Sequence, residues 1–335
     1  MIMRKLGADG PAISVLGLGT WALGGGEPGM RWVGGDDQLA VRTILHAVER
    51  GVSWIDTALA YGGGHAETLV GRALRVLPEP DRPLVFTKCG LAMPDPDRPP
   101  RLDLGARSLR RDCEASLRRL GMDRIDLLQI HWPGDDEAAL EGAWQTLAEL
   151  RSEGKIRLAG ASNFSIHQLE RSAARAPVAA SQSPLSLIER TSVAGFAWCA
   201  EHGAGGLVYS PLQSGLLSGR FAPDRLAAGD WRRSSAVEWD HQRNFQPPRL
   251  DRNLALAERV ADLARAAGRS AAEMSIAWTL AWRGVTGAMA GARRPEHLDG
   301  WIAAGELELG ADELDALARA VVETRGGRGP THPPA

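Results

Sequence analysis

Four polar side chains, an Asp, a Tyr, a Lys and a His, stand near the ends of short apolar stretches of this chain. Asp56 closes the first stretch, and Tyr61 follows it by five residues, just before three glycines. Lys88 and His131 stand near the ends of two later stretches. The chain has only two tyrosines, and only three of its 39 Lys and Arg residues are Lys. The positions of these rare residues are therefore informative.

Together these four residue types could move one proton to or from an oxygen atom. A free tyrosine has a pKa of about 10, too high for ready proton exchange near neutral pH. A neighbouring ammonium such as that of Lys88 favours the phenolate and lowers this pKa. A buried carboxylate such as that of Asp56 can keep the ammonium protonated and in place. His131 could donate a hydrogen bond that holds a substrate oxygen against the Tyr61 hydroxyl. With hydride from a nicotinamide, such a site interconverts a carbonyl and an alcohol.

Each of these residues has an ordinary explanation when it is taken alone. Asp56 could cap a helix, Tyr61 could close a turn, and Lys88 could be the solvated end of a strand. His131 could be a hydrogen-bonded core residue. The catalytic interpretation therefore requires a fold that brings all four to one place.

The rest of the chain predicts such a fold. Short apolar stretches alternate with segments whose apolar residues recur at spacings of three and four. After an N-terminal β-hairpin, the expected strands are residues 16–20, 54–57, 83–89, 125–131, 156–162, 178–184, 206–212 and 286–292. Eight strand–helix units predict an α/β fold, the (β/α)8 TIM barrel, in which the carboxyl ends of the strands form the active site. Extra C-terminal helices are expected at residues 253–267, 270–282 and 312–322.

We expect one barrel domain over residues 1–323 and a disordered tail, rich in glycine and proline, over residues 324–335. The alternative architecture is an open doubly wound sheet. Against it, no expected strand is followed by Gly-x-Gly-x-x-Gly at the start of a helix.

Composition narrows the function classes. The net charge of −2 and the lack of a basic stripe predict no nucleic-acid partner. No apolar run is long enough to span a bilayer, so no membrane association is expected. The three scattered cysteines show no metal-ligand spacing, and no metal site is expected. These cysteines, with an N-terminus that lacks a signal-peptide core, predict a cytoplasmic protein. The choice between a monomer and a homo-oligomer stays open.

Six stretches of the sequence resemble the aldo-keto reductase family, in order, over nearly the whole length. They are Asp56-Thr57-Ala58 with Tyr61-Gly62, Thr87-Lys88-Cys89-Gly90, Gln129-Ile130-His131-Trp132, Gly154-Lys155-Ile156-Arg157, Gly160-Ala161-Ser162-Asn163-Phe164, and Tyr209-Ser210-Pro211-Leu212 with Gly215-Leu216-Leu217-Ser218-Gly219. The resemblance implies the (β/α)8 barrel and a catalytic tetrad of Asp56, Tyr61, Lys88 and His131. In that tetrad Tyr61 is the general acid for reduction.

The resemblance also implies an extended nicotinamide dinucleotide bound without a Rossmann fold. Ser162, Asn163 and Gln182 would hold the carboxamide, and Tyr209 would stack on the nicotinamide ring. The pyrophosphate would lie under residues 210–219, where small residues let backbone N–H groups approach an anion. The expected cofactor contacts are Thr20, Trp21, Asp56, Ser162, Asn163, Gln182, Tyr209, Ser210, Pro211, Leu212, Ser214, Gly215, Gly291, Arg293, Arg294 and His297.

Arg293 and Arg294 bear on the choice of cofactor. The two arginines could grip a 2′-phosphate, which favours NADPH/NADP+ over NADH. Family members of this kind often carry Gln and Asn where this chain has His297 and Trp301. The adenine contacts and the strength of the NADPH preference therefore stay open.

The expected substrate pocket is aromatic. Its residues would be Trp21, Trp32, Tyr61, His131 and Trp132, which suits an apolar or sugar-like carbonyl compound. The segment 213–250 is long for a barrel loop, and we expect it to fold over the cofactor or to rim this pocket.

The expected activity is the reversible reduction of an aldehyde or ketone to an alcohol by NADPH. Hydride would come from nicotinamide C4 and the proton from Tyr61. One alternative is an NAD-linked dehydrogenase of a sugar or lactol. The other is a cofactor-sensing regulatory subunit that turns over slowly. In the two enzyme interpretations the partner is a small-molecule carbonyl or alcohol substrate.

Overall fold

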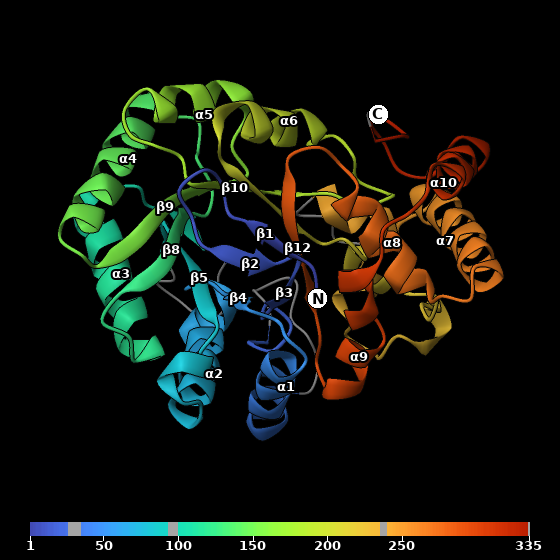
Figure 1. Cartoon of the computed structure of the whole chain (residues 1–335), viewed down its shortest axis with the longest axis horizontal. Helices are drawn as coiled ribbons and strands as arrows, with labels where there is room; N and C mark the ends of the chain where they lie inside the picture. The colour runs from blue at the N-terminus through green and yellow to red at the C-terminus, as the bar shows by residue number, and fades with distance from the viewer. Residues whose placement is uncertain (26–34, 93–99, 235–239, 334–335) are drawn as a thin grey trace.

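The computed structural model describes residues 1–25, 35–92, 100–234 and 240–333. Its centre is a closed barrel of parallel strands, which confirms the predicted (β/α)8 fold (Figure 1). The barrel strands are β3 (Leu16–Gly19), β4 (Trp54–Asp56), β5 (Leu84–Cys89), β8 (Ile125–Ile130), β9 (Ile156–Ser162), β10 (Ala180–Pro184), β11 (Gly205–Tyr209) and β12 (Val285–Gly291). Each pairs with the next barrel strand along the chain, and β12 closes the barrel against β3.

Helices surround the barrel (Figure 1). They are α1 (Asp37–Glu49), α2 (His65–Val76), α3 (Ala106–Leu120), α4 (Glu137–Ser152), α5 (Ile166–Ala173), α6 (Val193–His202), α7 (Arg249–Ala266), α8 (Ala271–Leu280), α9 (Pro295–Asp299) and α10 (Ala311–Thr324). The seventh barrel strand was predicted to reach residue 212, but it ends at Tyr209. The reason is the left-handed backbone of Ser210, whose φ is 54° and which no extended strand can contain.

The barrel interior is built in layers. Its apolar layer consists of Trp54, Phe86, Leu127, Leu158, Ala180, Leu207 and Met289. Side chains two residues apart on a strand point to the same face. The next inward positions on four of these strands are therefore Asp56, Lys88, Gln129 and Gln182, all of them buried. A polar layer thus lies directly above an apolar one, toward the carboxyl ends of the strands.

The N-terminal hairpin closes the opposite end of the barrel. It consists of β1 (Met3–Lys5) and β2 (Ala12–Ser14), which pair antiparallel. Leu6 and Ile13 belong to the interior apolar cluster and are fully buried. The indole N–H of Trp54 donates to the Ser14 carbonyl at 2.8 Å and so ties the hairpin to the barrel.

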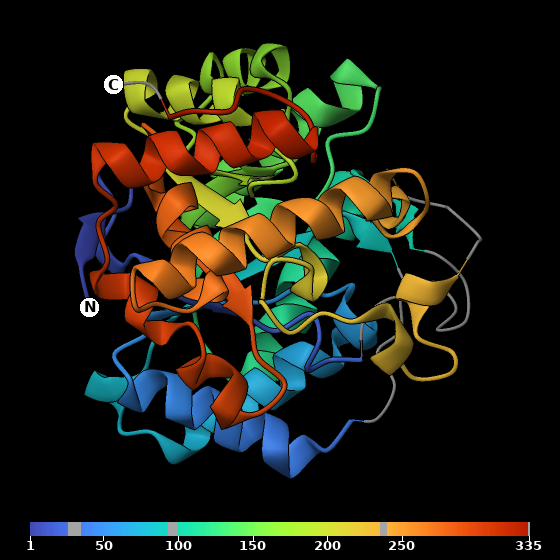
Figure 2. The same cartoon turned by 90° about the vertical axis from the view of Figure 1, so that its right-hand side faces the viewer.

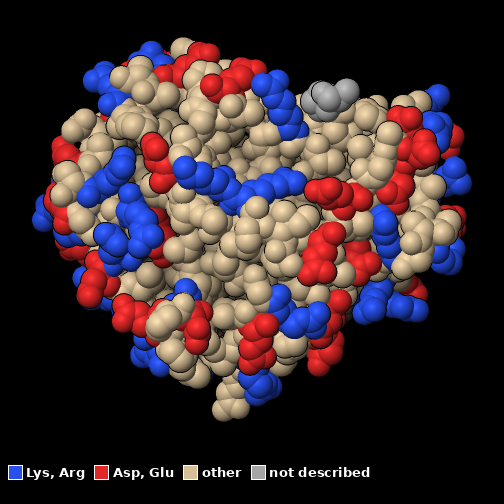
Figure 3. All heavy atoms as spheres, viewed as in Figure 1, with Lys and Arg blue, Asp and Glu red and all other residues tan. Residues whose placement is uncertain are grey.

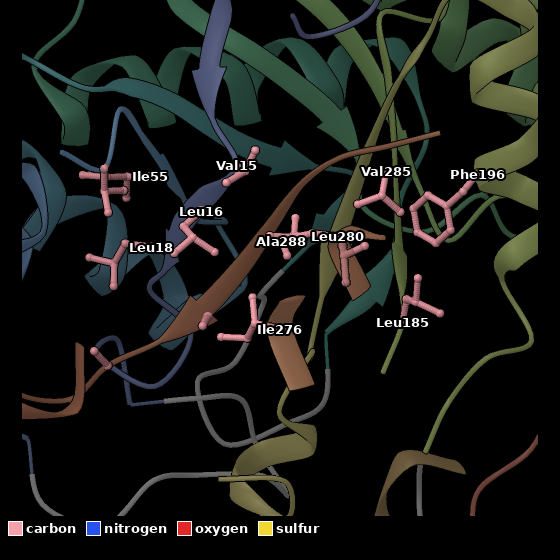
Figure 4. Close-up of a cluster of buried hydrophobic side chains, with 14 of the residues drawn as sticks. Val15, Leu16, Leu18, Ile55, Leu185, Phe196, Ile276, Leu280, Val285 and Ala288 are labelled. Carbon is pink, nitrogen blue, oxygen red and sulfur yellow. The ribbon is translucent and has the colours of Figure 1, made fainter. Parts of the chain in front are cut away.

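A larger apolar layer joins the outer face of the barrel to the helices. In the region drawn in Figure 4, Ile276 and Leu280 of α8 lie near Val285 and Ala288 of β12. Leu16 is among the fully buried residues of this cluster. Burial on both faces is what holds a parallel sheet together.

Two features were not expected from the sequence. A short hairpin, β6 (Leu91–Ala92) with β7 (Arg101–Leu102), follows β5. The described part of the long connection after β11 contains four 3₁₀ turns, at Gln213–Gly215, Pro223–Arg225, Trp231–Arg233 and Asp240–Phe245. Figure 2 places this connection, in yellow, at the end of the barrel opposite the N-terminus, which is the end where the polar layer lies.

The C-terminal tail, for which the sequence predicts disorder, makes specific contacts in its described part. Arg328 forms ion pairs with Glu189 at 2.7 Å and with Asp240 at 2.6 Å. The backbone of Arg190 and Arg328 is also hydrogen-bonded at 3.0 Å. These contacts attach the described tail to the β10–α6 loop and to the long connection.

The surface is mixed in charge where it can be seen. On the face in Figure 3, Lys and Arg side chains are interspersed with Asp and Glu, in keeping with the net charge of −2. Among the helices in the described part of the chain, none has the length and apolar character needed to cross a membrane.

Gly17 is required for packing inside the barrel. A Cβ atom there would lie 2.4 Å from the Trp54 ring. We expect Gly17→Ala to lower the free energy of unfolding by about 1–3 kcal/mol, because the indole must shift. Gly19→Ala is the matched control, since its Cβ would meet Met289 at an ordinary 3.6 Å. Equal urea midpoints for the two variants would contradict this account.

Candidate active site

A cavity of about 940 Å³ opens at the carboxyl ends of the strands. At its floor are Asp56, Tyr61, His131 and Gln182, and Trp21 and Trp132 also line it. The sequence predicted a site of four residues, and the barrel brings them together from three different strand–loop units. They are Asp56, Tyr61, Lys88 and His131. Concave sites of this size, apolar with a few convergent polar groups, are typical of ligand-binding sites.

Lys88 and Asp56 form a buried ion pair in the polar layer. The Lys88 Nζ lies 2.5 Å from Asp56 Oδ1, and each side chain is 1% exposed. Lys88 also donates to the backbone carbonyl of Thr57 at 3.1 Å. The second carboxylate oxygen of Asp56 accepts the side-chain amide of Gln182 at 2.8 Å. Both carboxylate oxygens of Asp56 thus accept a hydrogen bond from a buried donor.

Tyr61 approaches this pair through its hydroxyl. The Lys88 Nζ lies 3.3 Å from the Tyr61 Oη. Tyr61 starts a turn in which Gly62, Gly63 and Gly64 all have positive φ, between 61° and 93°. At Gly62 no other residue fits, because a Cβ would lie 2.0 Å from the carbonyl oxygen of Gly24. The three glycines therefore permit the tight turn that aims Tyr61 at Lys88.

His131 is neutral near pH 7. Burial, and then the nearby Lys88 charge, lower the pKa of its imidazole well below the usual 6.5. Its ring lies 5.9 Å from the Tyr61 ring in an edge-on arrangement. A neutral imidazole has one N–H to donate and one nitrogen that can accept. With Tyr61 beside it, the pair can hold an oxygen atom and exchange one proton with it.

Asn163 and Tyr209 form the opposite wall. The Asn163 amide donates to the His131 carbonyl at 3.0 Å and to Ser162 Oγ at 3.1 Å. The Tyr209 hydroxyl donates to Asn163 Oδ1 at 2.8 Å. Asn163 has a φ of 64°, a conformation that Asn tolerates better than most residues. These bonds fix the Tyr209 ring at the cavity wall.

The sequence itself also matches a known protein family. Residues 15–321 match the family described as Aldo/keto reductase family. The chain belongs to this family. It is therefore an oxidoreductase that depends on NAD(P)H, with the barrel fold that the sequence predicted.

Three relatives illustrate the similarity. The aldo-keto reductase YhdN of Bacillus subtilis (strain 168) is 35% identical over 305 residues, which cover 89% of this chain and 87% of that protein. The NADH-specific methylglyoxal reductase of Escherichia coli (strain K12) is 32% identical over 336 residues, covering 96% of this chain and 99% of that protein. The structure of the glycerol dehydrogenase AKR11B4 from Gluconobacter oxydans matches with a TM-score of 0.84 at 33% identity, covering 99% of both chains.

Most of the cofactor contacts expected for this aldo-keto reductase line the one cavity. They are Trp21, Asp56, Ser162, Asn163, Gln182, Tyr209, Ser210, Pro211, Leu212, Ser214, Gly215, Gly291, Arg293 and His297. Thr20 is fully buried behind the cavity wall, where its hydroxyl donates to the Asp56 carbonyl at 3.0 Å. Arg294 is exposed, and the described residues that line the cavity do not include it. Trp32, expected in the substrate pocket, lies outside the described residues.

The cavity lining also contains cations that the sequence did not predict. Arg220 and Arg232 line it together with Arg293. Burial first, and then the charges of Arg294 and Arg293, lower the pKa of His297, which reports a positive local potential. Arg232 pairs with Asp230 at 2.6 Å and donates to the Ser214 carbonyl at 2.9 Å. No local pattern in the sequence could have placed Arg220 and Arg232 here, because both stand in the long irregular connection.

Among residues 1–25, 35–92, 100–234 and 240–333, no group of three His, Cys, Asp or Glu side chains is placed to hold a metal ion. The three cysteines are buried and free, and burial raises the pKa of the Cys199 thiol to about 12.

The buried ion pair of Lys88 and Asp56 leads to a prediction about the stability of the fold. Lys88→Met leaves Asp56 as an uncompensated buried charge, and we expect it to lower the free energy of unfolding by about 3–5 kcal/mol. Adding Asp56→Asn should restore at least half of that loss, because the charge is removed. Urea unfolding of the two variants measures the difference.

Lys155→Met serves as the control for this pair. Lys155 is 32% exposed and lies 2.9 Å from Glu114, and exposed pairs contribute about 1 kcal/mol or less. A double variant no more stable than Lys88→Met would contradict the assignment of a coupled buried pair.

Proposed function

We propose that this aldo-keto reductase reduces an aldehyde or ketone to an alcohol with NADPH, in a reversible reaction, and that Tyr61 gives the proton. The observation that carries the proposal is the placement of the Lys88 ammonium, 2.5 Å from Asp56 and 3.3 Å from the Tyr61 hydroxyl. A cation at hydrogen-bond distance stabilises a phenolate, so that the phenol becomes a better acid.

The side chains have separate tasks in this proposal. Asp56 holds Lys88 charged and in place, and Lys88 stabilises the negative charge left on Tyr61 after proton transfer. His131 donates a hydrogen bond to the carbonyl oxygen and keeps it near the Tyr61 hydroxyl. Because His131 is neutral, it orients the oxygen without competing as the proton source.

The cavity residues fit a nicotinamide dinucleotide. When bound, the cofactor supplies the hydride that adds to the carbonyl carbon. Tyr209 offers an aromatic face, half-buried at the wall, and Ser162 and Asn163 offer polar groups beside it. The cluster of Arg220, Arg232 and Arg293 at the other end suits phosphate groups.

The preference for NADPH rests on Arg293. Burial, and then Arg294 and Arg232, lower the pKa of Arg293, as expected for a cation among cations that would gain from an anionic ligand. Glu296 nearby opposes this field in part. One relative is named as NADH-specific, so the relatives do not decide the matter. Arg293 would grip a 2′-phosphate that NADH lacks.

Oxidation of an alcohol, the reverse reaction, is the second candidate function. The matching structure with a TM-score of 0.84 is named a glycerol dehydrogenase. The same residues can oxidise an alcohol, with Tyr61 accepting the hydroxyl proton, and NAD+ would then suffice as oxidant.

The proton role of Tyr61 can be tested against the only other tyrosine of the chain. We expect Tyr61→Phe to lower kcat for carbonyl reduction by roughly 10²- to 10⁴-fold, the usual contribution of a positioned general acid. Binding of NADPH, followed by its thermal shift, should be retained. Tyr209→Phe keeps the ring and loses the hydrogen bond to Asn163, so a much smaller loss is expected. Unchanged turnover in Tyr61→Phe would sink the assignment.

The cofactor preference can be measured by thermal shift with NADP+ and NAD+ at equal concentration. We expect the larger shift with NADP+. Arg293→Met should weaken NADP+ binding by roughly 10- to 100-fold, the range of one or two charge-assisted hydrogen bonds, and NAD+ binding much less. Arg233→Met is a control, because Arg233 lies in the long connection after β11, is not among the described residues that line the cavity, and donates its side chain to the Leu226 carbonyl. A larger shift with NAD+ would contradict the proposed preference for NADPH.

A further inference from the structure

A fully buried carboxylate lies on the helix side of the barrel, outside the cavity. Glu67, in the first turn of α2, is 0% exposed. Its Oε1 accepts the hydroxyl of Thr87 at 2.6 Å, and its Oε2 accepts Nε and Nη2 of Arg119 at 2.7 and 2.6 Å. A buried charge is costly unless it is paired and hydrogen-bonded. Three short contacts from two different elements meet that condition here.

The Thr87 contact attaches Glu67 to the strand that carries Lys88. Phe86 belongs to the apolar cluster inside the barrel. Because side chains alternate along a strand, Phe86 and Lys88 face inward and Thr87 faces the helices. A hydrogen bond to the Thr87 hydroxyl therefore fixes β5 from its outer side, at the residue before the ammonium.

The Arg119 contact attaches the same carboxylate to the turn that carries Tyr61. Arg119 packs on Gly64, where a Cβ would lie 2.6 Å from the Arg119 Nε. Gly64 is the N-cap residue of α2 and ends the glycine turn that starts at Tyr61. Gly71 allows α2 to approach α3 closely, since a Cβ there would lie 2.3 Å from the Arg119 carbonyl oxygen.

We propose that Glu67 is a positioning residue for the reaction: through Thr87 and Arg119 it sets the separation between the Tyr61 hydroxyl and the Lys88 ammonium. This inference rests on the proposed function, because it gives the 3.3 Å contact between those groups its importance. The glycine turn needs such support. Three glycines with positive φ have much freedom to lose, and local preference alone does not hold Tyr61 in one place.

The charged surroundings of Glu67 come from three elements. Arg119 faces it from α3, and Cys89 lies near it on β5, where burial, Asp112 and Cys113, and after them Glu67, raise the pKa of the Cys89 thiol. Its place in the first turn of α2 also suits the positive end of the helix. A purely structural role would need nothing more than these contacts. The test must therefore separate stability from the geometry at Tyr61.

Thr87→Val removes the hydroxyl donor to Glu67 and keeps the shape of the side chain. We expect kcat for carbonyl reduction to fall roughly 10- to 100-fold, as for a displacement of up to about 1 Å between reacting groups. The basic limb of the pH profile of kcat should move to higher pH, because Tyr61 lies farther from the ammonium. The KM for cofactor should stay within about twofold, since Thr87 faces away from the cavity. Thr87→Ser, which keeps the hydroxyl, should restore both kcat and the pH limb.

Thr146→Val is the matched control for lost stability. Thr146 is 2% exposed and donates to the Gly142 carbonyl at 2.9 Å within α4. Both valine variants should lower the melting temperature, but only Thr87→Val should change kcat and the pH limb. Wild-type kcat and pH limb in Thr87→Val, or a failure of Thr87→Ser to restore them, would overturn the proposal.

Arg119→Lys is a milder second variant, in case Thr87→Val does not fold. It keeps a positive charge at a residue whose side chain is 24% exposed but loses the Nε donor. We expect a smaller fall in kcat with the same direction of pH shift, and no change in either would overturn the proposal. Failure of the proposed function is distinguishable, because Tyr61→Phe would then retain full turnover whatever the Thr87 variants do.

Discussion

The structure around the cavity depends on one interaction, the buried ion pair of Lys88 and Asp56. Removing two charges from water costs several kcal/mol each, and the pair is tolerated only when the remaining donors and acceptors are satisfied. Here Thr57 and Gln182 satisfy them. Gln182 is in turn 3.4 Å from the Gln129 amide oxygen, so the polar layer of the barrel acts as a support for the pair. The apolar layer below keeps water from reaching it.

This support explains why Asp56, Lys88 and His131 come from different strand ends. A strand offers one inward side chain every two residues, so no single strand can present a carboxylate, an ammonium and an imidazole at the same height. Asp56, Lys88 and His131 therefore come from three neighbouring strand ends. Tyr61 alone is on a loop, and its turn is held by contacts from outside, at Gly24 on one side and Arg119 on the other.

The inward residues could be predicted from the sequence because strand alternation and barrel closure act on every strand in the same way. Glu67 could not, since a Glu in the first turn of a helix is usually exposed, and its burial depends on the close approach of α3 at Gly71. Arg232 and the tail residue Arg328 stand in segments without periodicity, whose course is set by tertiary contacts alone. Gln182 was predicted from resemblance as a cofactor contact. Its bond to Asp56 could not be predicted, because it depends on barrel closure, which brings the side chains of β10 and β4 together.

The charged groups around the cavity differ in how far they are compensated by neighbouring charges. At the tetrad end the ion pair compensates itself and His131 is neutral, so this end offers hydrogen bonds and little net field. Elsewhere in the cavity lining, burial first and then neighbouring arginines lower the pKa values of Arg293 and His297. In the proposed function, a dinucleotide would bind with its phosphates toward these arginines and its reduced, uncharged nicotinamide toward Tyr61. A neutral carbonyl compound would meet no unpaired charge beside Tyr61, and its oxygen would be held by the hydrogen bonds of Tyr61 and His131.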